Sequence, residues 1–209
     1  MAYGINSLYN IGRGSTMSRL NSEMKNMKRT LILERAAEMF EQQGYEEMKV
    51  STLAKEVGVS VGSIYAYFDS KEGLYSAWVL KEIEGAYVHF SALVEKDLSF
   101  DELIRASVAI KFSIFSQKKR SLATGAMNNP FFFESQQIAH KIAFERLYSL
   151  YIEPIEKVKG VEIDTMQLVY ILNAMGNAYV LRWIEGDIED LEAKVDEVST
   201  AFVRLVKGC

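Results

Sequence analysis

Cysteine is almost missing from this sequence, because Cys209 is the only one. An internal disulfide is therefore ruled out, and a chain of this kind fits the reducing cytoplasm. Proline occurs only at Pro130 and Pro154, and alternating runs of β-branched residues are missing as well. The sequence therefore predicts an all-α fold.

Long apolar runs and catalytic motifs are also lacking. No run reaches the roughly 18 apolar residues of a membrane span, and the N-terminus lacks a secretory apolar stretch, so no membrane partner is expected. His89 and His140 are the only histidines, and the sequence holds no HExxH, Walker or GxSxG pattern. Neither a nucleophile–base pair nor a metal cluster can be assembled, so we expect no enzyme, no catalytic residue, no metal and no cofactor.

The sequence also lacks an excess of positive charge. The formal net charge is −4. Residues 1–75 carry nine basic and nine acidic side chains, so the whole deficit lies in the remainder of the chain. Any nucleic-acid footprint must come from the local placement of charge.

Hydrophobic spacing predicts a series of helices, about nine in total. Pro154 is expected to kink or end one of them. A brief helix is expected within 121–130. The other expected ranges are 24–43, 51–57, 61–68, 71–96, 100–117, 134–158, 163–185 and 188–207.

Residues 1–23 have no hydrophobic period and are expected to form a flexible arm. They are either a leader preceding a start at Met17 or Met24, or an arm whose Arg13 and Arg19 touch DNA. Basic residues Lys25, Lys28 and Arg29 then cluster at the start of the first expected helix. They form either a solvated helix end or a phosphate-facing patch.

The stretch 51–75 is the most informative. Gly58 suits a left-handed helix end, and Ser60 suits the N-cap of the next helix. Ile64 and Phe68 lie one turn apart and should point inward, whereas Val61, Ser63, Tyr65 and Tyr67 can point outward. Two short helices across a glycine-containing turn are typical of a helix-turn-helix.

Residues 32–75 resemble the N-terminal domain of the tetracycline-repressor-like (TetR) family of bacterial transcription regulators. The resemblance rests on the order and spacing of Ile32-Leu33, Ala36-Ala37, Met39-Phe40, Gly44-Tyr45, Leu53-Ala54, Gly58-Val59-Ser60, Gly62, Ile64-Tyr65, Tyr67-Phe68, Lys71-Glu72 and Leu74. It departs at Lys49-Val50, where the family commonly has a capping Ser or Thr. Ser51 is expected to take over that role and start the helix later.

The resemblance implies a domain organisation and a function. Residues 24–73 would be the three-helix DNA-binding domain, and residues 74–209 a helical bundle for effector binding and dimerisation. The chain would be a ligand-responsive regulator, by default a repressor, which binds a pseudo-palindromic operator as a homodimer and is released by a small apolar or aromatic effector.

The resemblance also implies site residues. Gly62 would let the helix N-terminus approach the DNA backbone, and Val61 and Ser63 would read bases. Thr52, Tyr65, Tyr67 and Lys71 resemble phosphate-contacting positions, and Ser60 joins the DNA-binding set as the N-cap. Tyr65 and Tyr67 could alternatively pack against the first helix.

The bundle should hold the effector and the dimer contacts. The expected effector residues are Phe112, Phe115, Met127, Phe131, Phe144, Tyr148, Asn173 and Asn177. The two asparagines could instead form ordinary interhelical hydrogen bonds. Ala174, Gly176 and Ala178 are small enough for close approach of a second subunit, or they pack only within one chain.

Two rival functions stay open. One is an enzyme, which the missing motifs disfavour. The other is a protein of this fold that acts through a protein partner and has a vestigial DNA face. The neutral N-terminal part, and the absence of Arg, Asn or Gln from 61–68, keep that alternative in view.

Overall fold

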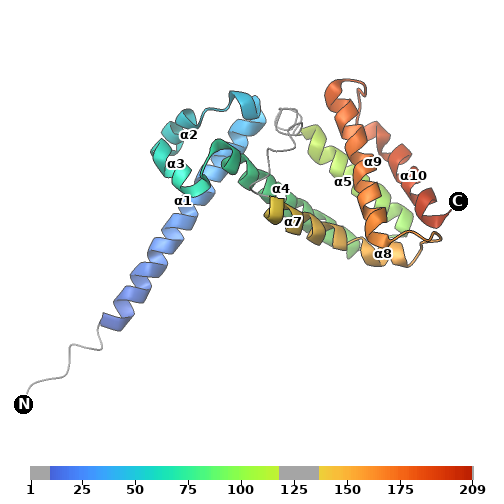
Figure 1. Ribbon diagram of the computed structural model, residues 1–209, viewed down its shortest axis with the longest axis horizontal. Coiled ribbons are helices and arrows are strands. Elements are labelled where there is room, and N and C mark those ends of the chain that lie inside the picture. The colour runs from blue at the N-terminus through green and yellow to red at the C-terminus, as the bar shows by residue number, and fades with distance from the viewer. Residues whose placement is uncertain (1–9, 118–136, 209) are drawn as a thin grey trace, which may run out of the picture.

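The computed structural model describes residues 10–117 and 137–208, and no side chain before residue 17 or at 137–138. Throughout those ranges the secondary structure is helical, without a strand (Figure 1). None of these helices is long and apolar enough to cross a membrane. In chain order they are α1 (Asn10–Glu47), α2 (Val50–Val57), α3 (Val61–Phe68), α4 (Lys71–Val94), α5 (Phe100–Gln117), α7 (Gln137–Ser149), α8 (Ile152–Glu156), α9 (Thr165–Glu185), the short 3₁₀ turn η2 (Glu192–Lys194) and α10 (Val195–Lys207).

A first core joins α1 to α4. Ile32, Ala36 and Phe40 of α1 are fully buried there. Each of the short helices α2 and α3 buries only two or three side chains, so both depend on α1 and α4 for stability. The first turns of α4 supply Trp78 to the same core, so this helix runs through the expected domain boundary after residue 73.

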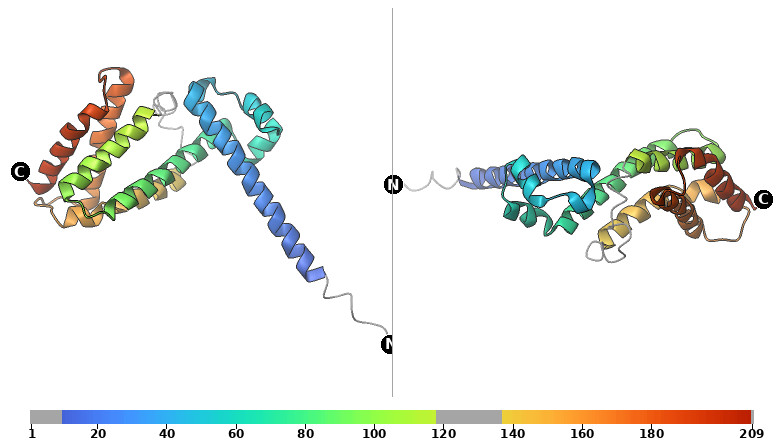
Figure 2. Two further views of the ribbon diagram at one scale, coloured as in Figure 1. Left: turned by 180° about the vertical axis from the view of Figure 1, so that it is seen from behind. Right: turned by 90° about the horizontal axis from the view of Figure 1, so that it is seen from above.

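The N-terminal segment differs from the expected flexible arm. Helix α1 begins at Asn10, and its first turns project away from the rest of the molecule (Figures 1 and 2). The expected start at Met24 is wrong because apolar side chains already recur at helical spacing from Met17 onward. Gly44 interrupts the helix where expected, with φ 81° and ψ 172°, a conformation that suits glycine.

A second core holds α5 and α7–α10 together, and its fully buried members include Phe112, Ile155, Leu168 and Phe202. Helix α7 lies along α4, while α10 lies beside α5 and α9 (Figure 2). Helix α4 therefore belongs to both halves of the molecule. It is a rigid connection between them.

The expected helix 134–158 is two helices, α7 and α8, and the break precedes Pro154. A proline ring collides with the carbonyl four residues earlier, here that of Leu150, so α7 ends and Pro154 sits in the first turn of α8. The brief helix expected within 121–130 lies in the undescribed range.

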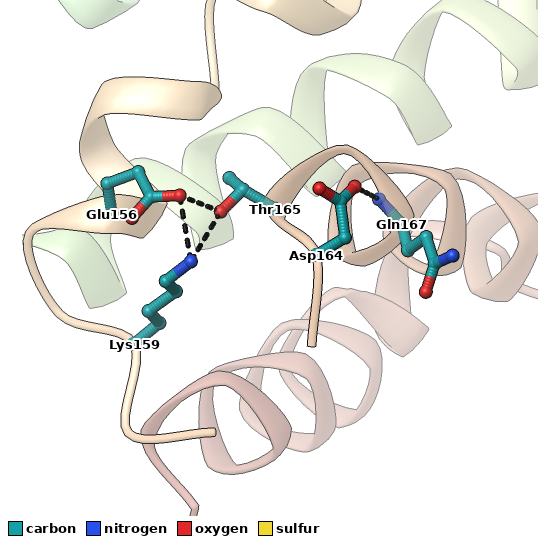
Figure 3. Close-up of polar contacts among 5 residues, drawn as sticks. All are labelled: Glu156, Lys159, Asp164, Thr165 and Gln167. Carbon is teal, nitrogen blue, oxygen red and sulfur yellow. Dashed lines mark hydrogen bonds and ion pairs between the residues drawn. The ribbon is translucent and has the colours of Figure 1, made fainter. Parts of the chain in front are cut away.

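Polar contacts fix the connection from α8 to α9 (Figure 3). The Thr165 hydroxyl donates to the Glu156 carboxylate, and Lys159 Nζ lies 2.8 Å from Glu156 Oε1. Asp164 Oδ1 accepts the Gln167 N–H at 3.1 Å and caps α9. This cap places the start of α9 at Thr165, two residues after the expected Ile163.

Candidate nucleic-acid interface and effector region

The turn between α2 and α3 is built from backbone and cap contacts. Gly58 ends α2 in the left-handed conformation, with φ 75° and ψ 36°. The Val59 N–H donates to Ala54 O at 2.9 Å, and Ser60 Oγ accepts the Ser63 N–H at 3.0 Å. The N-terminus of α3 is therefore held in one position, as Gly58 and Ser60 predict.

The start of α2 corrects one expectation. The helix begins at Val50 with Lys49 as N-cap, and no side chain caps it, so Ser51 lies inside the helix and does not cap it. Lys49 O accepts the N–H groups of Thr52 and Leu53 at 3.0 and 3.1 Å. A backbone carbonyl in extended geometry starts this helix without a hydroxyl.

The outer surface of α3 presents most of the expected DNA-binding residues. Ile64 and Phe68 point into the core, whereas the Tyr65 side chain is 40% exposed. Thr52, Ser60 and Gly62 are exposed, and Val61 and Ser63 are half-buried. Ser60 Oγ and Ser63 Oγ lie 2.8 Å apart, which leaves the Ser63 hydroxyl with further bonding capacity.

Gly62 has no structural need to be glycine. A Cβ at this position would meet only Ser60 Oγ, at 3.8 Å. A glycine at this position would instead let an external surface approach the helix N-terminus closely. The free N–H groups there attract phosphate.

Two residues expected to contact phosphate also make contacts within the chain. Lys71 Nζ donates to Glu46 O at 3.1 Å and lies 4.5 Å from the centroid of the Tyr45 ring. Tyr67 is partly buried against the first core, as its packing alternative predicted. The ammonium of Lys71 has three N–H donors, so a phosphate contact by this residue stays a prediction.

A polar contact lies directly behind Lys71. The Tyr45 hydroxyl donates to Glu72 Oε1 at 2.9 Å. Hydrogen bonds from its own backbone N–H and from Ser70 lower the pKa of the Glu72 carboxyl. The pKa of Tyr45 is raised, mainly by burial and secondly by its hydrogen bond to Glu72. Glu72 stays ionised and ties α4 to the end of α1.

The joint from α3 to α4 leaves little slack. Asp69 has a positive φ of 63°, and Ser70 Oγ accepts the Gly73 N–H at 3.0 Å. A Cβ at Gly73 would lie 1.9 Å from Phe68 O, so only glycine fits. Any movement of α4 must therefore carry α3 with it.

Arg29 of α1 contacts the aromatic ring of Phe68 on α3. The Arg29 guanidinium lies 5.0 Å from the centroid of the Phe68 ring, which places a cation beside the C-terminal end of the helix. The sequence showed Arg29 only as part of the basic cluster at residues 25–29 and did not indicate its contact with Phe68.

The effector region contains a lysine that sequence reasoning missed. Lys111 Nζ donates to Asn173 O at 3.1 Å, to Asn173 Oδ1 at 2.9 Å and to Asn177 Oδ1 at 2.8 Å. The two asparagines are thus engaged in interhelical hydrogen bonds, the alternative left open above. Burial lowers the pKa of the Lys111 ammonium to about 7. The sequence does show Lys111 as a single charge in the otherwise apolar stretch from Val108 to Phe112, a pattern that indicates a buried lysine.

Among the described residues, the expected aromatic side chains lie on two helices, α5 and α7. Phe112 is fully buried, with its ring centroid 6.5 Å from that of Tyr179, and Phe115 is half-buried. Phe144 and Tyr148 pack on each other at 5.7 Å, on α7. Met127 and Phe131 lie outside the described residues. A hollow of about 390 Å³ between α5 and α10 includes none of the expected effector residues.

The three small residues of α9 separate into two groups. Gly176 is buried inside the chain, where a Cβ would lie 3.0 Å from Lys111 Nζ, so its small size makes room for that lysine. Gly176 thus packs within one chain, the alternative to a dimer contact given above. Ala174 and Ala178 are exposed, as are the larger apolar side chains of Tyr170 and Leu181 on the same helix.

A buried histidine connects the bundle to α4. His140 Nε2 of α7 lies 3.1 Å from both Ser76 O and Ser76 Oγ. Both residues are buried. The sequence showed only an isolated histidine, because its partner lies 64 residues away.

Comparison with known proteins supports this organisation. Residues 32–78 match the family described as bacterial regulatory proteins, tetR family. Over 104 residues the chain is 29% identical to the HTH-type transcriptional regulator UidR of Escherichia coli K12, covering 49% of this chain and 53% of UidR. It is 30% identical over 106 residues to the fatty acid metabolism regulator protein of Bacillus subtilis, covering 51% and 50%.

A solved structure shows the same fold over a longer range. The transcriptional regulator FadR from Bacillus subtilis, in complex with stearoyl-CoA, superposes with a TM-score of 0.67 over 85% of this chain and 98% of FadR, at 20% identity. The chain spans about half the length of the curated relatives it matches. Residues 32–78 therefore form a domain of the tetR family of bacterial regulatory proteins.

Proposed function

We propose that the chain is a ligand-responsive transcription regulator that works in the cytoplasm, a repressor that binds a pseudo-palindromic DNA operator as a homodimer and leaves it when a small apolar effector binds. The exposed surface of α3 carries this proposal, because the caps at Gly58 and Ser60 hold it rigidly and its glycine at position 62 has no internal role.

Helix α3 enters the major groove in this proposal. Val61 meets a thymine methyl and Ser63 a base edge, while Tyr65 and Thr52 bind phosphate. The free N–H groups beside Gly62 add a further phosphate contact. Because α3 carries no Arg, Asn or Gln, we expect moderate sequence preference with a large phosphate and shape component.

Two copies of α3 at a fixed separation are needed to read a pseudo-palindrome. The exposed apolar side chains of α9, Tyr170, Ala174, Ala178 and Leu181, recur at three- and four-residue spacing and would form the contact between subunits.

The effector would bind in the bundle among Phe112, Phe115, Phe144 and Tyr148, with Met127 and Phe131 as further members. The stearoyl-CoA bound by the FadR structure carries a long apolar chain, which supports an apolar effector here. A ligand that reaches Asn173 or Asn177 has to replace their bonds to Lys111. Movement of α7 would then reach α4 through His140 and Ser76.

A gel shift on the promoter next to the protein's own gene tests the DNA part. We expect a retarded complex at low salt that weakens steeply as salt rises, because phosphate contacts release counterions. Tyr65→Ala should weaken binding to every sequence, whereas Val88→Ala, which trims an exposed apolar side chain on α4, should not.

The rival proposal is a vestigial DNA face and a protein partner. Undetectable binding at low salt, with the domain folded, would favour that rival and end the DNA proposal. Equal affinity of the Tyr65→Ala and Val88→Ala variants would reject the assigned role of Tyr65 alone.

A further inference from the structure

Five exposed apolar side chains follow the projecting part of α1. Met17, Leu20, Met24, Met27 and Leu31 are 63%, 48%, 55%, 71% and 53% exposed, and we call them the seam. Their separations alternate between three and four residues, so they lie along one side of the helix. Isolated exposed apolar residues are ordinary, but a continuous row of this length indicates a contact surface.

The seam faces away from the domain's own core. At 100° per residue, its mean direction differs by roughly 140° from that of the buried residues Ile32, Leu33, Ala36, Met39 and Phe40 on the same helix. Over the part of the chain that the structure describes, nothing folds back onto the seam, and the helix stands clear of the bundle (Figures 1 and 2). A partner could therefore bind it without disturbing the DNA-binding domain.

The spacing is that of a heptad repeat, with Met17, Met24 and Leu31 at position a and Leu20 and Met27 at position d. Glu23 then occupies position g and Lys28 the following position e. In a parallel pair of helices, position g faces position e of the next heptad on the partner helix. Glu23 of each copy then lies beside Lys28 of the other, so two pairs of opposite charges form. In an antiparallel pair g faces g and e faces e, so these charges would not meet.

We propose that the seam pairs with the same seam of a second copy of this chain, as a parallel, in-register coiled coil over residues 17–31. The remaining basic residues of the stretch, Arg19, Lys25 and Arg29, fall on positions c, b and f, which stay in water in such a pair. The pairing adds a contact between copies to the one proposed at α9 and is independent of DNA binding. Two heptads form a short coiled coil, so the association is weak and is best trapped by cross-linking.

Cysteine cross-linking tests the pairing and its direction. In full-length protein carrying Cys209→Ser, Leu20→Cys places a thiol at a d position, and Ser22→Cys places one at f as the matched control. A disulfide requires Cα atoms closer than about 7 Å, and of these two positions only d meets that condition in a parallel pair. Under mild oxidation at micromolar concentration, we expect Leu20→Cys to form covalent dimer at least about tenfold faster than Ser22→Cys.

Charge exchange tests the register. Lys28→Glu alone should slow cross-linking of Leu20→Cys severalfold, and Glu23→Lys combined with Lys28→Glu should restore it. Because these positions are remote from both cores, circular dichroism should show unchanged melting.

Three results would overturn the proposal. Equal cross-linking rates for Leu20→Cys and Ser22→Cys would show that the seam is unpaired. Fast cross-linking in a mixture of Leu20→Cys and Met24→Cys, with neither variant forming covalent dimer alone, would show an antiparallel pair, in which position d faces position a. Cross-linking that needs added DNA or anionic lipid vesicles would assign the seam to those surfaces. No DNA enters the first two measurements, so their failure leaves the proposed regulator function intact.

Discussion

Gly73 is the residue on which the connection from α3 to α4 depends most directly. Gly73→Ala would place a methyl group 1.9 Å from Phe68 O, a backbone atom that can move only with α3 itself. We expect a loss of about 2 kcal/mol or more in the free energy of unfolding, by urea denaturation, together with weaker DNA binding.

Gly85→Ala on the same helix is the matched control. A Cβ at Gly85 meets nothing within 4 Å, so this substitution should stabilise the protein by up to about 1 kcal/mol through helix propensity. Equal effects of the two substitutions would contradict the steric argument.

Lys111 makes stability depend on pH. Burial lowers the pKa of this ammonium in the folded protein to about 7, from its ordinary value of 10.5. Between these values the unfolded chain binds more protons than the folded one, so this group's contribution to stability rises with pH. The unfolding free energy of the wild type, minus that of Lys111→Met, should rise between pH 7 and 10. The rise should be at most about 1.4 kcal/mol per pH unit.

Lys96→Met, which removes an exposed lysine beyond the end of α4, is the control for this series. Denaturation of all three proteins at pH 7, 8 and 9 gives the comparison. A difference between the wild type and Lys111→Met that stays constant with pH would show that the ammonium titrates normally in the folded protein.

At the scale of the helices, the contact between α4 and α7 is where the proposed effector response would reach α4. His140→Ala removes a buried ring whose Nε2 lies 3.1 Å from two oxygens of Ser76, so the polar contact of those oxygens with α7 is lost. We expect a loss of about 1–3 kcal/mol and faster amide hydrogen exchange in α7, with little change in the core of α1–α3.

His89→Ala is the natural control, because the only other histidine is exposed on α4 itself. It should change neither stability nor exchange. Faster exchange spread evenly over the whole molecule in His140→Ala would mean that the histidine stabilises the fold globally and does not couple two particular helices.

The sequence predicted helices well where their ends are local. Gly58 and Ser60 mark ends that the structure confirms, and so does the expected end at residue 185, where Gly186 caps α9. A left-handed glycine or a capping serine acts within a few residues. The start of α2 was misplaced because Lys49 initiates it through its backbone carbonyl, which no residue type reveals.

Features that depend on distant partners could not be predicted. Lys111 meets Asn173, and Gly176 makes room for it, although 62 residues separate the lysine from Asn173. The contacts of Lys71 with Glu46 and Tyr45 could not be predicted either, because these residues lie in another helix. Tertiary packing decided these roles.

For the whole molecule, the proposed function requires two reading helices held by one dimer. The outer surface of α9, with Ala174 and Ala178 between the exposed Tyr170 and Leu181, is where we expect the subunits to meet. Ala174→Glu places a charge in an apolar contact and should shift the protein from dimer toward monomer, measured by light scattering. Ala92→Glu puts the same charge on the exposed surface of α4 and should leave the mass unchanged.

The consequence for DNA follows from linkage between the two half-sites. A dimer binds the second half-site at a high effective concentration, whereas a monomer must bind each one separately, so Ala174→Glu should weaken operator binding at least tenfold. Wild-type affinity in a monomeric variant would show that one domain suffices and would remove the argument for a pseudo-palindrome. A variant that stays dimeric would move the contact between subunits away from α9, toward α10 or the helical extension at residues 17–31.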